Sequence, residues 1–161
     1  MRIDAAKLIK LRKLDSNCIM FATFMAGFNE FGILNQAVMN HASRRAGAFL
    51  AEFFRETQHE KLPDNFVGLL ELLNSTLGIC DDFIIQRNSD GYRVSIATEK
   101  CRFCPVGVGG AELEGTICPF PGLFESFING VLDNNAIKLV PVNRRFLLKN
   151  DGFCNIIYRI R

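Results

Sequence analysis

Four cysteines that are far apart in the sequence place the strongest constraint on how this chain can fold. Cys101 and Cys104 form a Cys-x-x-Cys pair, Cys118 follows a glycine-rich loop, and Cys154 lies in the last predicted strand. A tight turn can aim both sulfurs of such a pair at one tetrahedral ion, and two further thiolates can complete a structural Zn²⁺ site. We therefore predict that these four side chains converge on one metal ion, against the alternative that they are scattered small core residues.

The chemistry of four thiolates leaves the identity of the metal open. Four sulfurs give Zn²⁺ no free position, so a zinc site of this kind would be structural rather than hydrolytic. An iron–sulfur cluster is the alternative, because four cysteines can bind either group. Glu112 and Glu114 lie in the same loop and could replace one thiolate, whereas Cys18 and Cys80 have no partner pattern and are expected in the core.

The order of hydrophobic patterns predicts an α+β domain, with N-terminal helices packed on an antiparallel sheet. Apolar residues first recur at helical spacing and then, after Gly78, alternate as they do in strands. Asp15 is expected to cap the second helix, and Asn150-Asp151-Gly152 to form the last hairpin turn. The predicted helices are residues 4–14, 17–27, 33–56, 63–77 and 121–134, and the predicted strands are residues 79–86, 92–98, 136–148 and 153–160.

Length and composition fit one domain that covers residues 1–161. The hydrophobic content of 48% includes 15 Phe and no Trp, which suits a deep core and an apolar pocket equally. No apolar stretch reaches about 20 residues and no convincing cleavage site follows the basic N-terminal cluster, so we predict no membrane association and a cytoplasmic location. In that setting, cysteines are typically thiols and metal ligands rather than disulfides.

Charge and motifs argue against several function classes. The net charge of +2 and the dispersed basic residues argue against nucleic acid as a partner. The run Gly107-Val108-Gly109-Gly110 lacks the Lys-Ser/Thr that completes a phosphate loop. No Ser-His-Asp set is visible and there are only two histidines, so we predict no catalytic residues and favour a protein without enzymatic activity.

The predicted helix over residues 33–56 carries small residues that would let a neighbouring element approach closely. They are Ala42, Ala46, Gly47 and Ala48. A homodimer seam and packing within the chain would both use such residues, and the sequence leaves the two open.

Three stretches of the chain resemble the 4-vinyl reductase domain family, in particular its archaeal stand-alone members described as hydrocarbon-binding proteins. They are Arg44-Arg45-Ala46-Gly47, the helix that Cys118 opens (CPFPGLFESFINGVL), and the closing hairpin over residues 150–157 (NDGFCNII). The resemblance covers residues 35–160 and leaves residues 1–34 as an N-terminal helical extension.

This resemblance implies a dimeric α+β fold shared with the TRAPP vesicle-tethering subunits, the ligand-binding fold of nitric-oxide signalling and Golgi transport, with an apolar cavity between sheet and helices. It also implies a zinc ion held by a cysteine that opens a helix, a Glu-x-x-Cys, and a cysteine in the final strand. Cys118 and Cys154 match the first and the last of these. Asn143 and Phe146 stand where the Glu and Cys would fall, so the pair at 101 and 104 is the expected substitute.

Together these observations predict a zinc-containing sensor or carrier domain, a homodimer, that binds an apolar, aromatic or tetrapyrrole-like small molecule. The candidate ligand-contacting residues, each of which alone is more often an ordinary core residue, are Met20, Phe21, Phe24, Phe49, Phe53 and Phe66. One alternative is a reductase or reductase accessory that acts on a vinyl-bearing tetrapyrrole, although no nicotinamide or flavin motif is visible. The other is a zinc-ribbon nucleic-acid-binding module.

Overall fold

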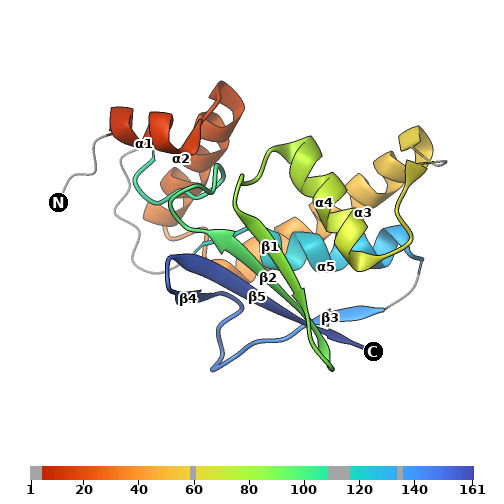
Figure 1. The fold of residues 1–161 in the computed structure, drawn as a ribbon. Coiled ribbons are helices and arrows are strands. Elements are labelled where there is room, and N and C mark those ends of the chain that lie inside the picture. Colours follow the sequence, from red (N-terminus) through yellow and green to blue (C-terminus); the bar gives the residue numbers. More distant parts are fainter. Residues whose placement is uncertain (1–4, 59–60, 109–116, 134–135) are drawn as a thin grey trace.

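The computed structural model describes residues 5–58, 61–108, 117–133 and 136–161. No helix within these ranges is both long enough and apolar enough to cross a membrane. Helices dominate the first half of the chain and strands the second, as Figure 1 shows. In chain order the elements are α1 (Ala5–Arg12), α2 (Ser16–Glu30), α3 (Gln36–Gln58), α4 (Phe66–Leu77), β1 (Phe83–Arg87), β2 (Gly91–Ala97), α5 (Phe120–Val131), β3 (Ile137–Leu139), β4 (Leu148–Asn150) and β5 (Phe153–Ile160).

Capping residues explain where the helices begin and end. Asp15 accepts a hydrogen bond from the backbone N–H of Cys18 at 2.8 Å and so caps α2, as predicted. Asn65 accepts from the N–H of Gly68 at 2.9 Å, and α4 therefore begins after Asn65 rather than at residue 63. Gly78 ends α4 in the left-handed conformation, at a φ of 62°, which costs a glycine little.

The strands form one antiparallel sheet in the order β1-β2-β5-β3, and β4 also pairs with β5. The predicted α+β class, helices with an antiparallel sheet, is therefore confirmed. The turn before β5 is the one predicted, with Asp151 and Gly152 both at positive φ. Because β5 pairs with three other strands, Cys154 is held on the most central strand of the sheet.

The predicted strand over residues 136–148 is wrong in its middle part. Only its two ends are strands, β3 and β4. Between them, Pro141 has no amide hydrogen to donate to a ladder. Asn143 and Arg144 then take positive φ values of 50° and 62° in a chain reversal that the bridge between Val142 and Arg145 closes. The chain therefore leaves the sheet after β3 and returns as a separate strand.

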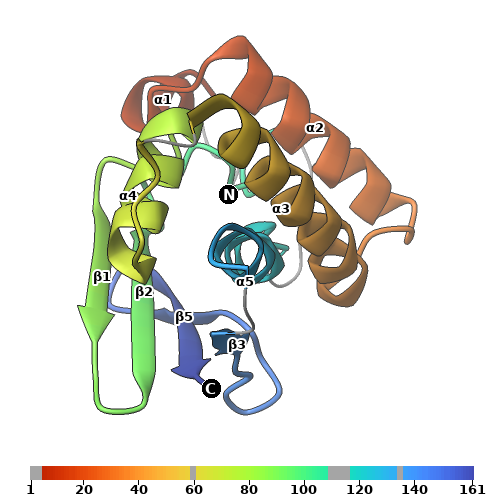
Figure 2. The same cartoon turned by 90° about the vertical axis from the view of Figure 1, so that its right-hand side faces the viewer.

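Helices cover one face of the sheet in two layers. Figure 2 shows α5 lying between the sheet and α3. The same view shows α4 lying over β1 and β2. The Phe66 ring of α4 stacks on Tyr92 of β2 with ring centres 4.0 Å apart, and Phe54 of α3 meets Phe127 of α5 edge-on at 5.3 Å. Buried Glu125 joins the layers, because it accepts hydrogen bonds from Arg44 of α3 and from the N–H of Leu139 of β3.

Glycines allow α3 and α5 to approach closely. A Cβ atom on Gly47 would clash with the backbone carbonyl of Leu123, and one on Gly122 would lie 2.6 Å from the carbonyl oxygen of Asn40. Of the small residues singled out above, Gly47 therefore serves packing within the chain. The three alanines beside it on α3 are exposed.

Replacing Gly47 with alanine is expected to lower the free energy of unfolding by about 2 kcal/mol, because the new methyl group meets backbone atoms of α5. The gain in helix propensity, about 1 kcal/mol, does not offset this clash. Gly27→Ala in α2 is the matched control, since nothing lies within 4 Å of its Cβ, and it is expected to stabilise the fold by about 0.5–1 kcal/mol. Urea unfolding measures both variants, and the same sign of change in both would contradict the close packing.

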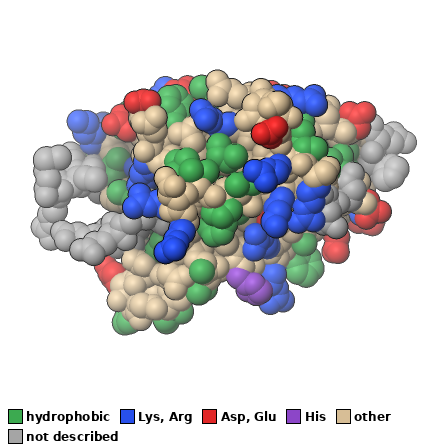
Figure 3. All heavy atoms as spheres, turned by 90° about the horizontal axis from the view of Figure 1, so that it is seen from below, with side chains coloured by type: hydrophobic (Ala, Val, Ile, Leu, Met, Phe, Trp, Pro, Cys, Tyr) green, Lys and Arg blue, Asp and Glu red, His purple; other side chains and the backbone are tan. Residues whose placement is uncertain are grey.

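The other face of the sheet is open to solvent and carries positive charge. Figure 3 views the molecule from this side and shows Lys and Arg side chains across it. Strand pairing places Arg93, Lys138 and Arg159 on this face, because their strand neighbours Val94 and Tyr158 are buried on the opposite one. None of these three cations forms an ion pair with a described residue. The small net charge therefore conceals a basic surface.

Candidate metal centre

Aromatic packing holds the loop that carries Cys101 and Cys104. This loop follows β2, and its Phe103 lies between two helices. The Phe103 ring meets Phe21 of α2 and Phe120 of α5 edge-on, with ring centres 5.7 Å apart in both pairs. The two thiols of the Cys-x-x-Cys pair are thus positioned by contacts that are distant in sequence.

The other two cysteines are held by hydrogen bonds from different elements. Cys118 lies two residues before the first residue of α5, and Gln36 at the start of α3 forms two hydrogen bonds with its backbone. The Gln36 side chain accepts from the Cys118 N–H at 2.8 Å and donates to the Cys118 carbonyl at 2.9 Å. On β5, the Cys154 sulfur lies 3.6 Å from the Thr98 hydroxyl. Cys118 is therefore held through its backbone, and Cys154 is held within strand β5.

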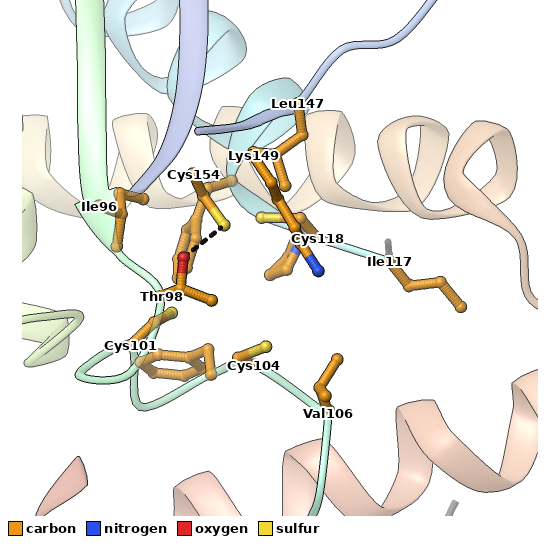
Figure 4. A pocket seen from close by; sticks show the side chains of 13 residues that line it. Ile96, Thr98, Cys101, Cys104, Val106, Ile117, Cys118, Leu147, Lys149 and Cys154 are labelled. Carbon is orange, nitrogen blue, oxygen red and sulfur yellow. Dashed lines mark hydrogen bonds between the residues drawn. The ribbon is translucent and has the colours of Figure 1, made fainter. Parts of the chain in front are cut away.

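All four predicted cysteines line one cavity. Figure 4 shows Cys101 and Cys104 on one side of it and Cys118 and Cys154 on the other. The cavity is enclosed mostly by apolar side chains and has a volume of about 20 Å³. A buried water needs about 10–15 Å³, so there is room for roughly one atom of that size. A drug-sized ligand occupies about 300–1,000 Å³ and does not fit here.

The four thiols surround the cavity without being drawn together as they would be on a bound ion. Within the described part of the chain, no group of three or more His, Cys, Asp or Glu side chains is arranged to hold a metal. A metal would have to bring the loop pair, Cys101 and Cys104, closer to Cys118 and Cys154.

Burial dominates the acid–base behaviour of these thiols. It raises the pKa of Cys101 and Cys118 well above the usual value for a thiol. Charge repulsion raises both further, and for Cys101 the largest such contribution comes from Cys104. The backbone N–H groups of Phe103 and Phe120 act in the opposite direction and lower the pKa of Cys101 and Cys118, respectively. Cys101 and Cys118 therefore hold their protons more tightly than exposed thiols do.

Two cations lie beside the cavity. Arg12 of α1 is only 5% exposed, and its Nη1 donates to the carbonyl oxygens of Cys104 at 3.0 Å and Val106 at 3.1 Å. No described carboxylate pairs with it, and its Nε has no hydrogen-bond partner. Lys149 lines the cavity from β4. Burial raises the pKa of Cys154 and the Thr98 hydrogen bond lowers it, and both cations also lower it.

The remaining cysteines and loop carboxylates are separate from the cavity or outside the described residues. Cys18 and Cys80 are buried core residues, as predicted. The Cys80 sulfur donates to backbone carbonyls and does not line the cavity. Glu112 and Glu114, considered as substitute ligands, lie outside the described residues.

The structure does not bring the six candidate ligand-contacting residues together. Phe66 is core, stacked on Tyr92, and Phe21 packs on the cysteine loop through Phe103. The other four are exposed to solvent on two different helices. They are Met20 and Phe24 on α2, and Phe49 and Phe53 on α3.

Sequence reasoning missed three residues at the centre: Arg12, Gln36 and Lys149. Gln36 and Arg12 act over more than 80 positions of sequence, so no local pattern marks them. Lys149 could have been found, because an antiparallel hairpin about Asp151 and Gly152 pairs it with Cys154.

Fold and site together define a small α+β protein with a four-cysteine cavity. A family model described as the MJ0207 family matches residues 32–160, and the chain belongs to this family. A protein of Methanocaldococcus jannaschii named uncharacterized protein MJ1342 is 26% identical over 108 residues, which cover 67% of this chain and 90% of that protein. Uncharacterized protein MJ0207 of the same organism is 37% identical over 51 residues, or 32% of this chain and 34% of that protein. No solved structure matches the chain.

The resemblance to the 4-vinyl reductase domain family is wrong. The family that matches over residues 32–160 is a different one, and it includes the stretches on which the resemblance rested. What that resemblance implied about a vesicle-tethering-type fold, a shared zinc-ligand pattern and a vinyl-bearing substrate therefore has no support. The four-cysteine prediction does not depend on it, because it also follows from the spacing of the thiols.

Proposed function

We propose that this protein is a zinc-binding protein, in which Cys101, Cys104, Cys118 and Cys154 hold one structural Zn²⁺. The observation that carries the proposal is the cavity: thiols from three separate segments line a space of about one atom. The donor set fits the metal, because four thiolates suit a closed tetrahedral zinc site. The ion would fasten the loop after β2 to the start of α5 and to β5.

The surrounding charge supports a metal–thiolate centre. A Zn²⁺ ion with four thiolates carries two net negative charges, and an ion buried without a partner is costly. Arg12 and Lys149 are two cations beside the same cavity. A bound zinc–thiolate group would give the buried Arg12 guanidinium the anion that it lacks among the described residues.

The cavity size separates the metal candidates. An iron–sulfur cluster contains several iron and sulfide atoms, whereas the space suits a single atom. We therefore favour zinc over a cluster. A role as a non-catalytic sensor or carrier of an apolar small molecule stays a prediction, and its ligand would have to bind elsewhere than in the cysteine cavity.

Metal analysis of the purified protein tests the proposal. Chains produced with zinc and iron both supplied are expected to contain one zinc per chain by inductively coupled plasma mass spectrometry. Zinc release by a thiol-modifying reagent should follow the loss of four of the six thiols, because Cys18 and Cys80 do not line the cavity. A colourless protein with zinc supports the proposal. A brown protein with iron and sulfide, or a protein that takes up no metal, overturns it.

A further inference from the structure

The N-terminal helices leave many large apolar side chains exposed. Twelve large apolar side chains are exposed among the described residues, and ten of these twelve precede residue 54. Three lie along α3, where Phe49 is 67% exposed, Phe53 55% and Val38 45%. A contiguous exposed apolar patch on a folded domain marks a surface that meets a partner.

The exposed face of α3 has the spacing of a helix that pairs with another helix. Ala42, Ala46, Phe49 and Phe53 are all exposed and follow one another at intervals of four, three and four. This is the spacing of the a and d positions of a coiled coil. The opposite face of α3, which includes Gly47, packs on α5 within the chain. A second helix can therefore lie along the outer stripe while α5 stays in place.

The order of sizes along this stripe fits an antiparallel copy of itself. Its first half has the small side chains of Ala42 and Ala46, and its second half the large rings of Phe49 and Phe53. A two-fold axis between residues 47 and 48 would place Phe49 of each copy over Ala46 of the other. The same axis would place Phe53 over Ala42. Large rings then meet small residues in every layer of the pair.

Charges beside the stripe fit the same axis. Arg45 and Glu52 are exposed and one heptad apart, so they lie on the same flank of the stripe. A two-fold axis perpendicular to the helices brings this flank against its own copy, and Arg45 then lies opposite Glu52. Neither Arg45 nor Glu52 forms an ion pair with a described residue.

We propose that two copies of this chain associate through antiparallel α3 helices. The stripe of Ala42, Ala46, Phe49 and Phe53 forms the centre of the interface, and Arg45 and Glu52 form its flanking ion pairs. The occupant is a second copy rather than an unrelated helix, because one axis satisfies both the size order and the charge order. An isologous interface requires this self-complementarity. The proposal does not rest on the metal centre.

Charge reversal on α3 tests the interface. Arg45→Glu places two glutamates opposite each other at both ends of the pair, and Glu52→Arg does the same with arginines. Each variant alone is expected to dimerise at least tenfold more weakly than the natural chain in sedimentation equilibrium. An equimolar mixture of the two variants should regain dimers, because every Glu then faces an Arg in the mixed pair.

Several results would overturn the proposal. The natural chain could be a monomer at about 100 μM, a concentration at which a specific dimer is populated. Either variant could dimerise as well as the natural chain, or the mixture could stay as monomeric as its parts. Both positions are exposed, so unfolding free energies should stay within about 0.5 kcal/mol and exclude misfolding as the cause. Phe49→Glu should also give monomers, and zinc content should be unchanged in all variants.

Discussion

Serine in place of Cys104 is expected to leave the purified protein with less than stoichiometric zinc and to lower its Tm by about 10 °C. A serine hydroxyl is a poor zinc ligand, because it does not ionise near neutral pH as a metal-bound thiol does. Binding energy at a structural zinc site contributes directly to folding. For a chain of this size about 1 kcal/mol shifts Tm by roughly 2–4 °C, so a loss of about 4 kcal/mol gives the expected change.

Cys80→Ser is the matched control for this prediction. Cys80 is buried and does not line the cavity, and serine can still donate to the carbonyl of Asp82 that the thiol now meets. The control is expected to lose some stability and to keep one zinc per chain. Zinc content by mass spectrometry and Tm by differential scanning calorimetry would be measured together. Full zinc occupancy in the Cys104 variant would remove this residue from the ligand set.

Alanine in place of Phe124 is expected to cost about 3–5 kcal/mol in the free energy of unfolding. Phe124 is 0% exposed and lies on α5, where it faces the sheet. Its ring stacks on Phe120 with centres 5.2 Å apart and meets Phe83 of β1 edge-on at 6.0 Å. Truncation leaves a cavity between helix and sheet that neither layer can close without moving.

Phe31→Ala gives the comparison for the core variant. Phe31 follows α2 and is 81% exposed, so its truncation is expected to change the free energy of unfolding by less than about 1 kcal/mol. Urea titration followed by circular dichroism measures both variants. Equal costs at the two positions would contradict the placement of α5 on the sheet.

Much of the fold follows from signals that act within a few residues. Asp15 and Gly78 mark helix ends through their own side chain and backbone, and Asp151 with Gly152 marks a hairpin through positive φ. The stretch over residues 136–148 reads as one strand because its apolar pattern is compatible with one. The structure divides this stretch into β3 and β4, because Pro141 and the chain reversal at Asn143 interrupt the hydrogen-bond ladder. Local sequence patterns indicate this interruption only weakly.

The cysteines of the candidate site could be predicted from the sequence, but the residues that support them could not. Spacing predicted one shared metal site for Cys101, Cys104, Cys118 and Cys154. The four line one cavity, and metal binding there stays a prediction. Their supporting residues could not be predicted in this way, because Arg12 and Gln36 reach them from helices at the other end of the sequence. The wrong family resemblance has a related cause. A few cysteines and glycines shared with another family specify a local arrangement without specifying descent.

Arg12 shows that the boundary of a family match is not a boundary of the folded unit. The match begins at residue 32, yet the guanidinium of Arg12 supplies the hydrogen-bond donor to two carbonyls of the cysteine loop. A chain shortened to the matched region would leave those carbonyls facing water and would remove α1 as a lid over the loop. A comparison of the whole chain with residues 32–160 alone is therefore expected to show a less stable cysteine loop in the shorter chain.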